Sequence, residues 1–161
     1  MSIKRTLVAG MSLSAAALVG IAVHEGYRGD AYIPVPGDVP TIGFGTTGGV
    51  RMGDRTDPVS ALQRALTDIQ GFEGALKRCV TVPLHQHEYD VFVSFSYNVG
   101  SSAFCRSTLV RKLNAGDYAG ACDELLRWRF VAGRDCAVPS SRCAGLWKRR
   151  QDEHAACLGV S

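Results

Sequence analysis

The spacing of hydrophobic residues predicts a chain that is mainly helical after residue 57. Leucine, isoleucine and phenylalanine recur there at three- and four-residue intervals, behind an Asp57-Pro58 pair that suits a helix N-cap and first turn. Another helix is expected after Pro83. Three more, separated by glycine-marked breaks, are predicted at residues 107–114, 117–128 and 146–157.

Residues 31–49 have a different pattern. Tyr, Ile, Val, Thr and Phe stand there among prolines and glycines, which predicts a small hairpin region. The predicted fold class is therefore α+β, mainly helical with a small N-terminal β-hairpin region.

An uncharged run follows Lys4 and Arg5. From Leu7 to Val23 it spans 17 residues, about 26 Å as a helix, which only just covers the hydrocarbon core of a bilayer. Eight of the 17 residues are Leu, Val, Ile or Met and nine are Ala, Gly or Ser, so membrane insertion is marginal. The two basic residues predict that the N-terminus stays inside the cell while the rest is exported.

Three interpretations of this run compete. It is a signal peptide cleaved at Ala15-Ala16-Ala17, the first helix of a soluble core, or a helix that enters the membrane and later leaves it. Many small residues make extraction from lipid cheap, which favours the third interpretation over the second. Composition alone does not choose between the first and the third.

Length and composition fit one globular domain. The chain has 161 residues, of which 46% are hydrophobic and 20% charged. The net charge of +3 is mild, and no basic stripe is interleaved with aromatic residues. We therefore expect no nucleic acid as a partner.

All six cysteines lie beyond residue 78. Their even number and the export-like N-terminus predict three disulfides formed in an oxidising compartment, and no zinc-type spacing is present. Six cysteines allow about 15 pairings. Only Cys136–Cys143 is predicted, because the Pro/Ser-rich loop between them is short. The alternative is that several cysteines are buried free thiols.

Glu25, Asp38 and Thr41 surround the predicted hairpin, just after an apolar segment. A carboxyl group beside apolar residues can hold and donate a proton, while a more solvated carboxylate stays charged. Glycosidases place such a pair on either side of a sugar bond. Taken alone, the pair is weak evidence, since most acids so spaced are solvated surface groups.

Several motifs in order along the chain resemble one family. They are EGYRG at 25–29, TIGFGTT at 41–47, YNVGSSAFCRSTLVRKLNAGDYAGACDELLRW at 97–128 and GLWKRRQDE at 145–153. Together they resemble the T4-like phage lysozymes of glycoside hydrolase family 24. With the N-terminal run and the cysteines, the chain is most similar to the signal-anchor-release endolysins.

The resemblance implies a lysozyme-like fold and an activity. The activity is hydrolysis of the β-1,4 bond between N-acetylmuramic acid and N-acetylglucosamine in peptidoglycan. The mechanism is of the inverting type and needs neither a metal nor a cofactor. The host cell is lysed as a result and phage is released.

The resemblance also implies roles for residues. Glu25 matches the family's general acid and Thr41 its water-positioning threonine. The second carboxylate does not match by position, because the loop is one residue longer than in the family. Asp38, three residues before Thr41, is the acid of this loop and is assigned as the displaced partner. Asp30, only five residues past Glu25, is the poorer candidate.

Asn98 and Ser107 fall where the family contacts sugar. For Ser107 a helix N-cap is an equal alternative. Trp128 and Trp147 are expected in the core rather than as sugar platforms, although Trp128, at a helix end, fits either position.

Two other polar clusters receive structural interpretations. The segment HQHE at 85–88 lacks the i,i+4 spacing that puts two metal ligands on one helical face, so exposed residues at a helix start are expected. Arg149, Arg150 and Glu153 are spaced to form an ion-paired face.

The chain as a whole is therefore predicted to be an exported muramidase. Residues 1–24 form the signal-anchor-release segment and residues 25–161 the lysozyme-like catalytic domain. The expected partners are peptidoglycan and, before release to the periplasm, the inner membrane, and the enzyme is expected to be a monomer. Two alternatives stay open: a disulfide-braced wall-binding protein without catalysis, suggested by the displaced carboxylate, and a lytic transglycosylase.

The anchor ends two residues before Glu25. If the anchor spans the membrane, Glu25 lies within about 3 Å of the lipid boundary along the helix axis, away from Asp38 and Thr41. The tethered enzyme is then inactive. Release would bring the acid into the site as part of the first helix.

Overall fold

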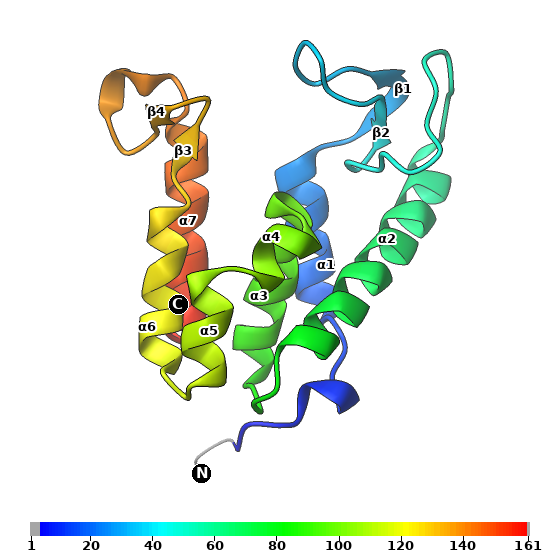
Figure 1. Cartoon of the computed structure of the whole chain (residues 1–161). Coiled ribbons are helices and arrows are strands. Elements are labelled where there is room, and N and C mark those ends of the chain that lie inside the picture. Colours follow the sequence, from blue (N-terminus) through cyan, green and yellow to red (C-terminus); the bar gives the residue numbers. More distant parts are fainter. Residues whose placement is uncertain (1–3, 161) are drawn as a thin grey trace. The chain divides into compact units, whose positions relative to one another are not determined.

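Helices dominate the computed structural model, which describes residues 4–160 (Figure 1). The chain falls into two compact units. Of the described residues, unit 1 takes 4–12 and 75–160, and unit 2 takes Leu13–Gly74. The predicted α+β class, with a small sheet beside many helices, is confirmed. The predicted boundary at residue 24 separates a membrane anchor from a catalytic domain rather than two folded units, and it stays a prediction.

Unit 2 contains one short helix, one small sheet and most of a long helix. In chain order these are α1 (Ala15–Glu25), β1 (Arg28–Tyr32), β2 (Thr41–Gly43) and α2 (Pro58–Cys79), whose last turns belong to unit 1. β1 and β2 pair antiparallel, with Arg28 opposite Gly43, Tyr32 opposite Thr41 and an irregular register between them. The predicted hairpin is confirmed, and its first strand begins three residues earlier than expected.

Side chains define both helix starts in unit 2. The Ser14 hydroxyl accepts a hydrogen bond from the Ala17 N–H at 3.1 Å and so begins α1. Asp57 Oδ1 accepts from the N–H groups of Val59 and Ser60 at 2.9 and 3.0 Å. The Ser60 hydroxyl also donates to this carboxylate, and these bonds hold the pKa of Asp57 below its ordinary value. The predicted N-cap at Asp57 is confirmed.

Unit 1 is built around α3 (Gln86–Val99), which contributes Tyr89, Phe92 and Phe95 to the core with no exposed surface. The remaining helices are α4 (Ser101–Cys105), α5 (Thr108–Asn114), α6 (Tyr118–Glu124) and α7 (Ala144–Cys157). Residues 125–127, predicted as α-helix, form a 3-10 turn instead. A second small sheet, β3 (Phe130–Val131) with β4 (Arg134–Asp135), was not predicted because two-residue strands leave no periodicity to detect.

Three disulfides brace unit 1. They join Cys79 to Cys105, Cys122 to Cys157 and Cys136 to Cys143. No described cysteine is free. The predicted number of disulfides and the one predicted pair are confirmed, and the alternative of free thiols is wrong.

Residues 4–12, here called the N-terminal strap, belong to unit 1. Thr6 exchanges two backbone hydrogen bonds with Leu84, at 2.7 and 2.8 Å. Arg5 donates two hydrogen bonds to the Glu88 carboxylate, at 3.0 and 2.7 Å. Gln86 Nε2 donates to the carbonyl of Ser12 at 2.9 Å. The strap is therefore held by backbone pairing and by a two-point ion pair.

The apolar run at residues 7–23 is not one helix in this structure. A 3-10 turn at Val8–Gly10 and extended residues precede α1, which covers 11 residues. Within residues 4–160, none of the helices combines the length and apolar character that a membrane span requires.

Candidate active site

Glu25 is the last residue of α1 and is half-buried. Gly26 follows with φ of 69°, a conformation that L side chains rarely adopt, and its N–H closes the helix on the Ala22 carbonyl at 3.0 Å. The chain then turns directly into β1. The end of an apolar helix thus positions the predicted acid at the beginning of the sheet.

Thr41 is the first residue of β2 and is only 5% exposed. It lies opposite Tyr32 of β1. Its hydroxyl donates a hydrogen bond to the Val39 carbonyl at 3.2 Å. The sheet therefore fixes the backbone of Thr41, and this bond orients its hydroxyl.

Asp38 lies in the loop between the two strands and is exposed. Its N–H donates to the Val35 carbonyl at 3.0 Å, and its Oδ1 accepts from the Val39 N–H at 2.8 Å. Asp38 and Thr41 thus bind the N–H and the carbonyl of the same residue, Val39. The structure brings these two predicted residues together around one peptide segment.

The other acids of unit 2 have structural partners. Asp30 pairs with Arg55 at 2.9 Å on the surface. Asp54 accepts from the Arg51 N–H at 2.8 Å, and Asp57 caps α2. Two more acids bind at a distance in sequence: Asp68 accepts from the Thr46 hydroxyl at 2.6 Å and Glu73 from the Leu13 N–H at 2.8 Å. Asp38 differs from these acids, because within the described chain its carboxylate accepts a hydrogen bond only from the N–H of the next residue, Val39.

Asn98 and Ser107 lie in unit 1. Asn98 is exposed near the end of α3, and its side-chain oxygen accepts a hydrogen bond from Arg150. Ser107 is the N-cap of α5, with its hydroxyl accepting from the Val110 N–H at 3.2 Å. The helix-cap interpretation of Ser107 is confirmed. The sugar contacts of both residues stay predictions.

The predicted ion pairing of Arg149 and Arg150 with Glu153 is confirmed, at 3.1 and 2.5 Å. The paired face is buried: Arg150 has no exposed surface, and its guanidinium lies 4.8 Å from the Phe95 ring centre. Burial raises the pKa of Glu153, and the charges of the two arginines oppose that rise. A buried charge of this kind persists only where it is paired and hydrogen-bonded.

The hydrogen bond between Arg150 and Asn98 has no signal in the sequence, because 52 residues separate the two. The i,i+3 spacing of Arg150 and Glu153 was visible, but it does not show that α7 buries this arginine against α3. Trp128 is half-buried, packs edge-on against Phe95 at 5.3 Å, and lines a cavity of about 380 Å³ together with Asn98. Trp147 is half-buried as well, so neither tryptophan is a full core residue.

The segment at 85–88 begins α3, as predicted. His85 is its N-cap, and Glu88 closes a capping box by accepting from the His85 N–H at 2.8 Å. Glu88 is not exposed as expected: its side chain is 4% exposed and pairs with Arg5. Within residues 4–160, the structure contains no group of three side chains suited to hold a metal ion.

Residues 22–153 match the family model described as phage lysozyme. The chain belongs to the phage lysozyme family. It is 38% identical to the endolysin of Acyrthosiphon pisum secondary endosymbiont phage 1, over 90% of this chain and 97% of that protein. It is also 38% identical to the SAR-endolysin of Pseudomonas phage phiKMV, over 91% of this chain and 89% of that protein.

Solved structures agree with this assignment. A mutant of P22 lysozyme superimposes with a TM-score of 0.75 at 34% identity, covering 92% of this chain and 99% of that one. The predicted family, fold and enzyme class are confirmed. This phage lysozyme is a glycoside hydrolase of the muramidase class, an endolysin that acts on peptidoglycan.

Proposed function

We propose that Glu25 is the general acid of this muramidase and that Asp38 and Thr41 hold the attacking water. The observation that carries the proposal is the shared binding of Val39 by Asp38 and Thr41. It supports a carboxylate and a hydroxyl that act on one water although the loop is longer than in the family.

The proposed reaction is a single displacement. Glu25 donates its proton to the oxygen of the β-1,4 bond as that bond breaks. Water attacks the anomeric carbon from the opposite face and gives its proton to Asp38. The Thr41 hydroxyl, whose own proton is donated to the Val39 carbonyl, accepts a hydrogen bond from this water and keeps it in line. The product sugar then has inverted configuration.

The test compares Glu25→Gln, Asp38→Asn and the control Asp30→Asn. Asp30 is an exposed acid of the same hairpin whose carboxylate already pairs with Arg55. Glu25→Gln should abolish hydrolysis of purified peptidoglycan, because an amide has no proton to donate. Asp38→Asn should lower kcat by roughly 100-fold or more, the usual contribution of a general base, while Asp30→Asn stays near wild type.

Near-normal kcat for Asp38→Asn would refute its assignment. Mass spectrometry of the products distinguishes the alternatives: anhydro ends would indicate a transglycosylase, and no soluble products from the wild-type enzyme would indicate a wall-binding protein. Proton NMR at early times should show the inverted anomer first. Retained configuration would exclude the single displacement.

We also propose that residues 1–24 tether the enzyme to the inner membrane before release into the periplasm. Residues 15–23 of α1 are all uncharged, yet Ile21 is the one residue of α1 that is fully buried. Val19 and Val23 are 62% and 75% exposed. A helix that is apolar all round is normally buried in protein or in lipid. An earlier stay in the membrane accounts for this composition.

The tether is tested by N-terminal sequencing of the enzyme recovered from lysing cells. An N-terminus ahead of Leu7, first in the membrane fraction and later in the soluble one, supports release without cleavage. A mature N-terminus after Ala17 or Ala22 would show a cleaved signal peptide instead.

A further inference from the structure

Residues 129–143 form an exposed lobe of unit 1, here called the arginine loop. It consists of the β3–β4 hairpin and the turn closed by the Cys136–Cys143 disulfide, and it leads into α7 (Figure 1). The N–H of Cys136 donates to the Arg129 carbonyl at 2.8 Å, and the Arg129 side chain pairs with Asp135 at 3.0 Å. A disulfide, a backbone bond and an ion pair therefore hold the loop in one shape.

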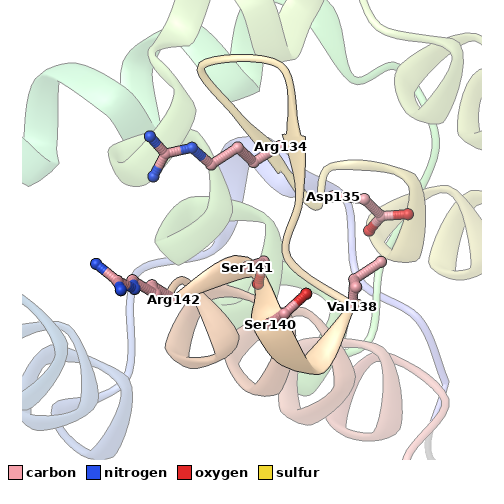
Figure 2. Close-up of a pocket in the computed structure, with 6 residues that line it drawn as sticks. All are labelled: Arg134, Asp135, Val138, Ser140, Ser141 and Arg142. Atoms are coloured by element: carbon pink, nitrogen blue, oxygen red, sulfur yellow. The ribbon is translucent and has the colours of Figure 1, made fainter.

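Two positive charges of this loop are not neutralised. The loop has three arginines and one acid, Asp135, which pairs with Arg129 and accepts from the Ala137 N–H at 3.0 Å. Within residues 4–160, neither Arg134 nor Arg142 makes an ion pair. Figure 2 shows both extending to the same side of the loop, with Asp135 on the opposite side.

The two arginines share an open depression with two hydroxyl groups. Arg134, Arg142, Ser140 and Ser141 line it, together with Asp135 and Val138, and its volume is about 460 Å³. Guanidinium groups bind the oxygens of a phosphate in a two-point geometry, and serine hydroxyls donate to the same oxygens. The depression therefore suits a phosphate group.

The same loop also exposes apolar side chains. Phe130, Val131 and Val138 are 57%, 49% and 47% exposed. Val131 lies opposite Arg134 in the hairpin, so the two side chains share one face of it. The turn between them, Ala132-Gly133, has φ of 48° and 77°. Two-residue turns with positive φ at both positions favour Asn-Gly, and alanine there makes the tip wholly apolar.

We propose that the arginine loop binds the surface of an anionic phospholipid bilayer. Arg134 and Arg142 contact lipid phosphates, while Phe130 and Val131 enter the boundary between headgroups and acyl chains. This combination of cationic and apolar groups is typical of segments that lie in a membrane interface. A free phosphate or an acidic wall polymer would use the arginines but would leave the apolar tip in water.

The use of this site depends on the proposed release of the enzyme beside the inner membrane. A released enzyme that still adheres to the bilayer acts first on the adjacent wall. The binding itself does not depend on catalysis or on release, so the two proposals can fail separately.

The experiment measures binding of the full-length, oxidised protein to vesicles by sedimentation, with phosphatidylglycerol mixed into phosphatidylcholine or with phosphatidylcholine alone. Arg134→Gln with Arg142→Gln is compared with Arg106→Gln with Arg111→Gln, which removes the same charge from other exposed positions of unit 1. All variants keep residues 1–24, so any contribution of the apolar segment cancels. Hydrolysis of soluble peptidoglycan fragments is followed in parallel.

Arg134→Gln with Arg142→Gln should weaken binding to anionic vesicles about 30-fold, which corresponds to about 1 kcal/mol for each basic residue. The control pair should change binding less than about threefold. Phe130→Ser with Val131→Ser should weaken vesicle binding. Inorganic phosphate should compete for the arginines of this variant as well as it does in the wild type, so the apolar residues report on lipid and not on free phosphate. Hydrolysis of soluble fragments should stay unchanged in both arginine-pair variants.

Equal losses for the two arginine pairs would overturn the proposal, since net charge alone would then explain binding. An unchanged affinity for vesicles in Phe130→Ser with Val131→Ser would overturn membrane insertion and would indicate a phosphate site alone. Loss of binding to purified sacculi, with vesicle binding retained, would assign the loop to the wall instead.

Discussion

The two units of the molecule are stabilised in different ways. Unit 1 has three disulfides, a core of fully buried aromatic residues and a buried ion network around Arg150. In the described part of unit 2 there is no disulfide, and its first helix, α1, has one fully buried residue. Yet Glu25, Asp38 and Thr41 all lie in unit 2. Covalent bracing is thus absent from the unit that carries the proposed catalytic groups.

This difference has a physical explanation in the proposed release. A segment that leaves the membrane and folds as α1 must not be cross-linked beforehand. The disulfides join residues from 79 onward, so they can form while residues 7–23 are still in lipid. The disulfide-linked part of unit 1, from residue 75 onward, can therefore fold before the strap docks on it and before unit 2 obtains Glu25.

The largest effect is expected from strengthening the anchor. Gly10→Leu, Ser12→Leu and Gly20→Leu together should keep the protein exported, membrane-bound and non-lytic, because each leucine adds about 0.3–0.6 kcal/mol or more of insertion free energy. A Cβ atom added at Gly10 or Gly20 meets nothing within 4 Å. Ser14 is left unchanged because it caps α1.

Fractionation and culture turbidity measure the outcome. Gly71→Leu with Gly145→Leu, at open positions of α2 and α7, is the control and should lyse normally. Full lysis by the anchor variant while it still sediments with membranes would show that the tether does not inhibit the enzyme.

Removal of single disulfides should give the next largest effect, in unit 1. Loop-closure entropy predicts losses in the free energy of unfolding of about 3.8 kcal/mol for Cys122–Cys157, about 3.5 for Cys79–Cys105 and about 2.5 for Cys136–Cys143, in the order of their sequence separations of 35, 26 and 7. Denaturant unfolding of the paired serine variants measures them. Reductant should lower stability without switching activity on, and activation by reductant would contradict a structural role.

Glu88→Gln should destabilise the attachment of the strap by about 1.5–3 kcal/mol, because it weakens a charged hydrogen bond to Arg5 on a side chain that is only 4% exposed. Burial alone would raise the pKa of Glu88, but the bonds from Arg5 and the His85 N–H outweigh it and hold the pKa below its ordinary value of 4.5. This stabilisation is therefore complete above pH 4.5 and is lost as the pH falls through the lowered pKa.

Hydrogen exchange at the N–H groups of Thr6 and Leu84 measures that attachment. The matched control is Asp152→Asn, which breaks the exposed pair with Lys148 and should change stability by less than about 1 kcal/mol. Equal effects of the two variants would show that the Arg5–Glu88 pair behaves as an ordinary surface pair.

The smallest effect is expected in unit 2, from Asp57→Ala. Loss of the N-cap of α2 should reduce the free energy of unfolding only slightly, because Asp57 is exposed and its bonds compete with water. Thermal unfolding measures it, with Asp54→Ala as a nearby control that removes a turn bond but no helix cap. A larger loss than that from any single disulfide would reverse the stability difference between the units.

Local signals in the sequence determined most of the helices. Asp57-Pro58 shows where α2 begins, because a cap and a first-turn proline act within four residues. The short loop between Cys136 and Cys143 showed their pairing for the same reason. Glu25 and Thr41 were assigned through local motifs that resemble those of the family, and Asp38 as the acid of its loop. The catalytic roles of all three stay predictions.

Other features depend on tertiary structure, since they join residues far apart in sequence. The sequence did not allow the pairings Cys79–Cys105 and Cys122–Cys157 to be chosen among the possible ones. The helical spacing of charged residues in α7 likewise does not show that Arg150 is buried beside Phe95. The docking of Arg5 on Glu88 likewise follows from the path of the strap past Leu84. Sequence patterns report the local backbone and one face of a helix, whereas burial and long-range pairing are decided only when those faces pack.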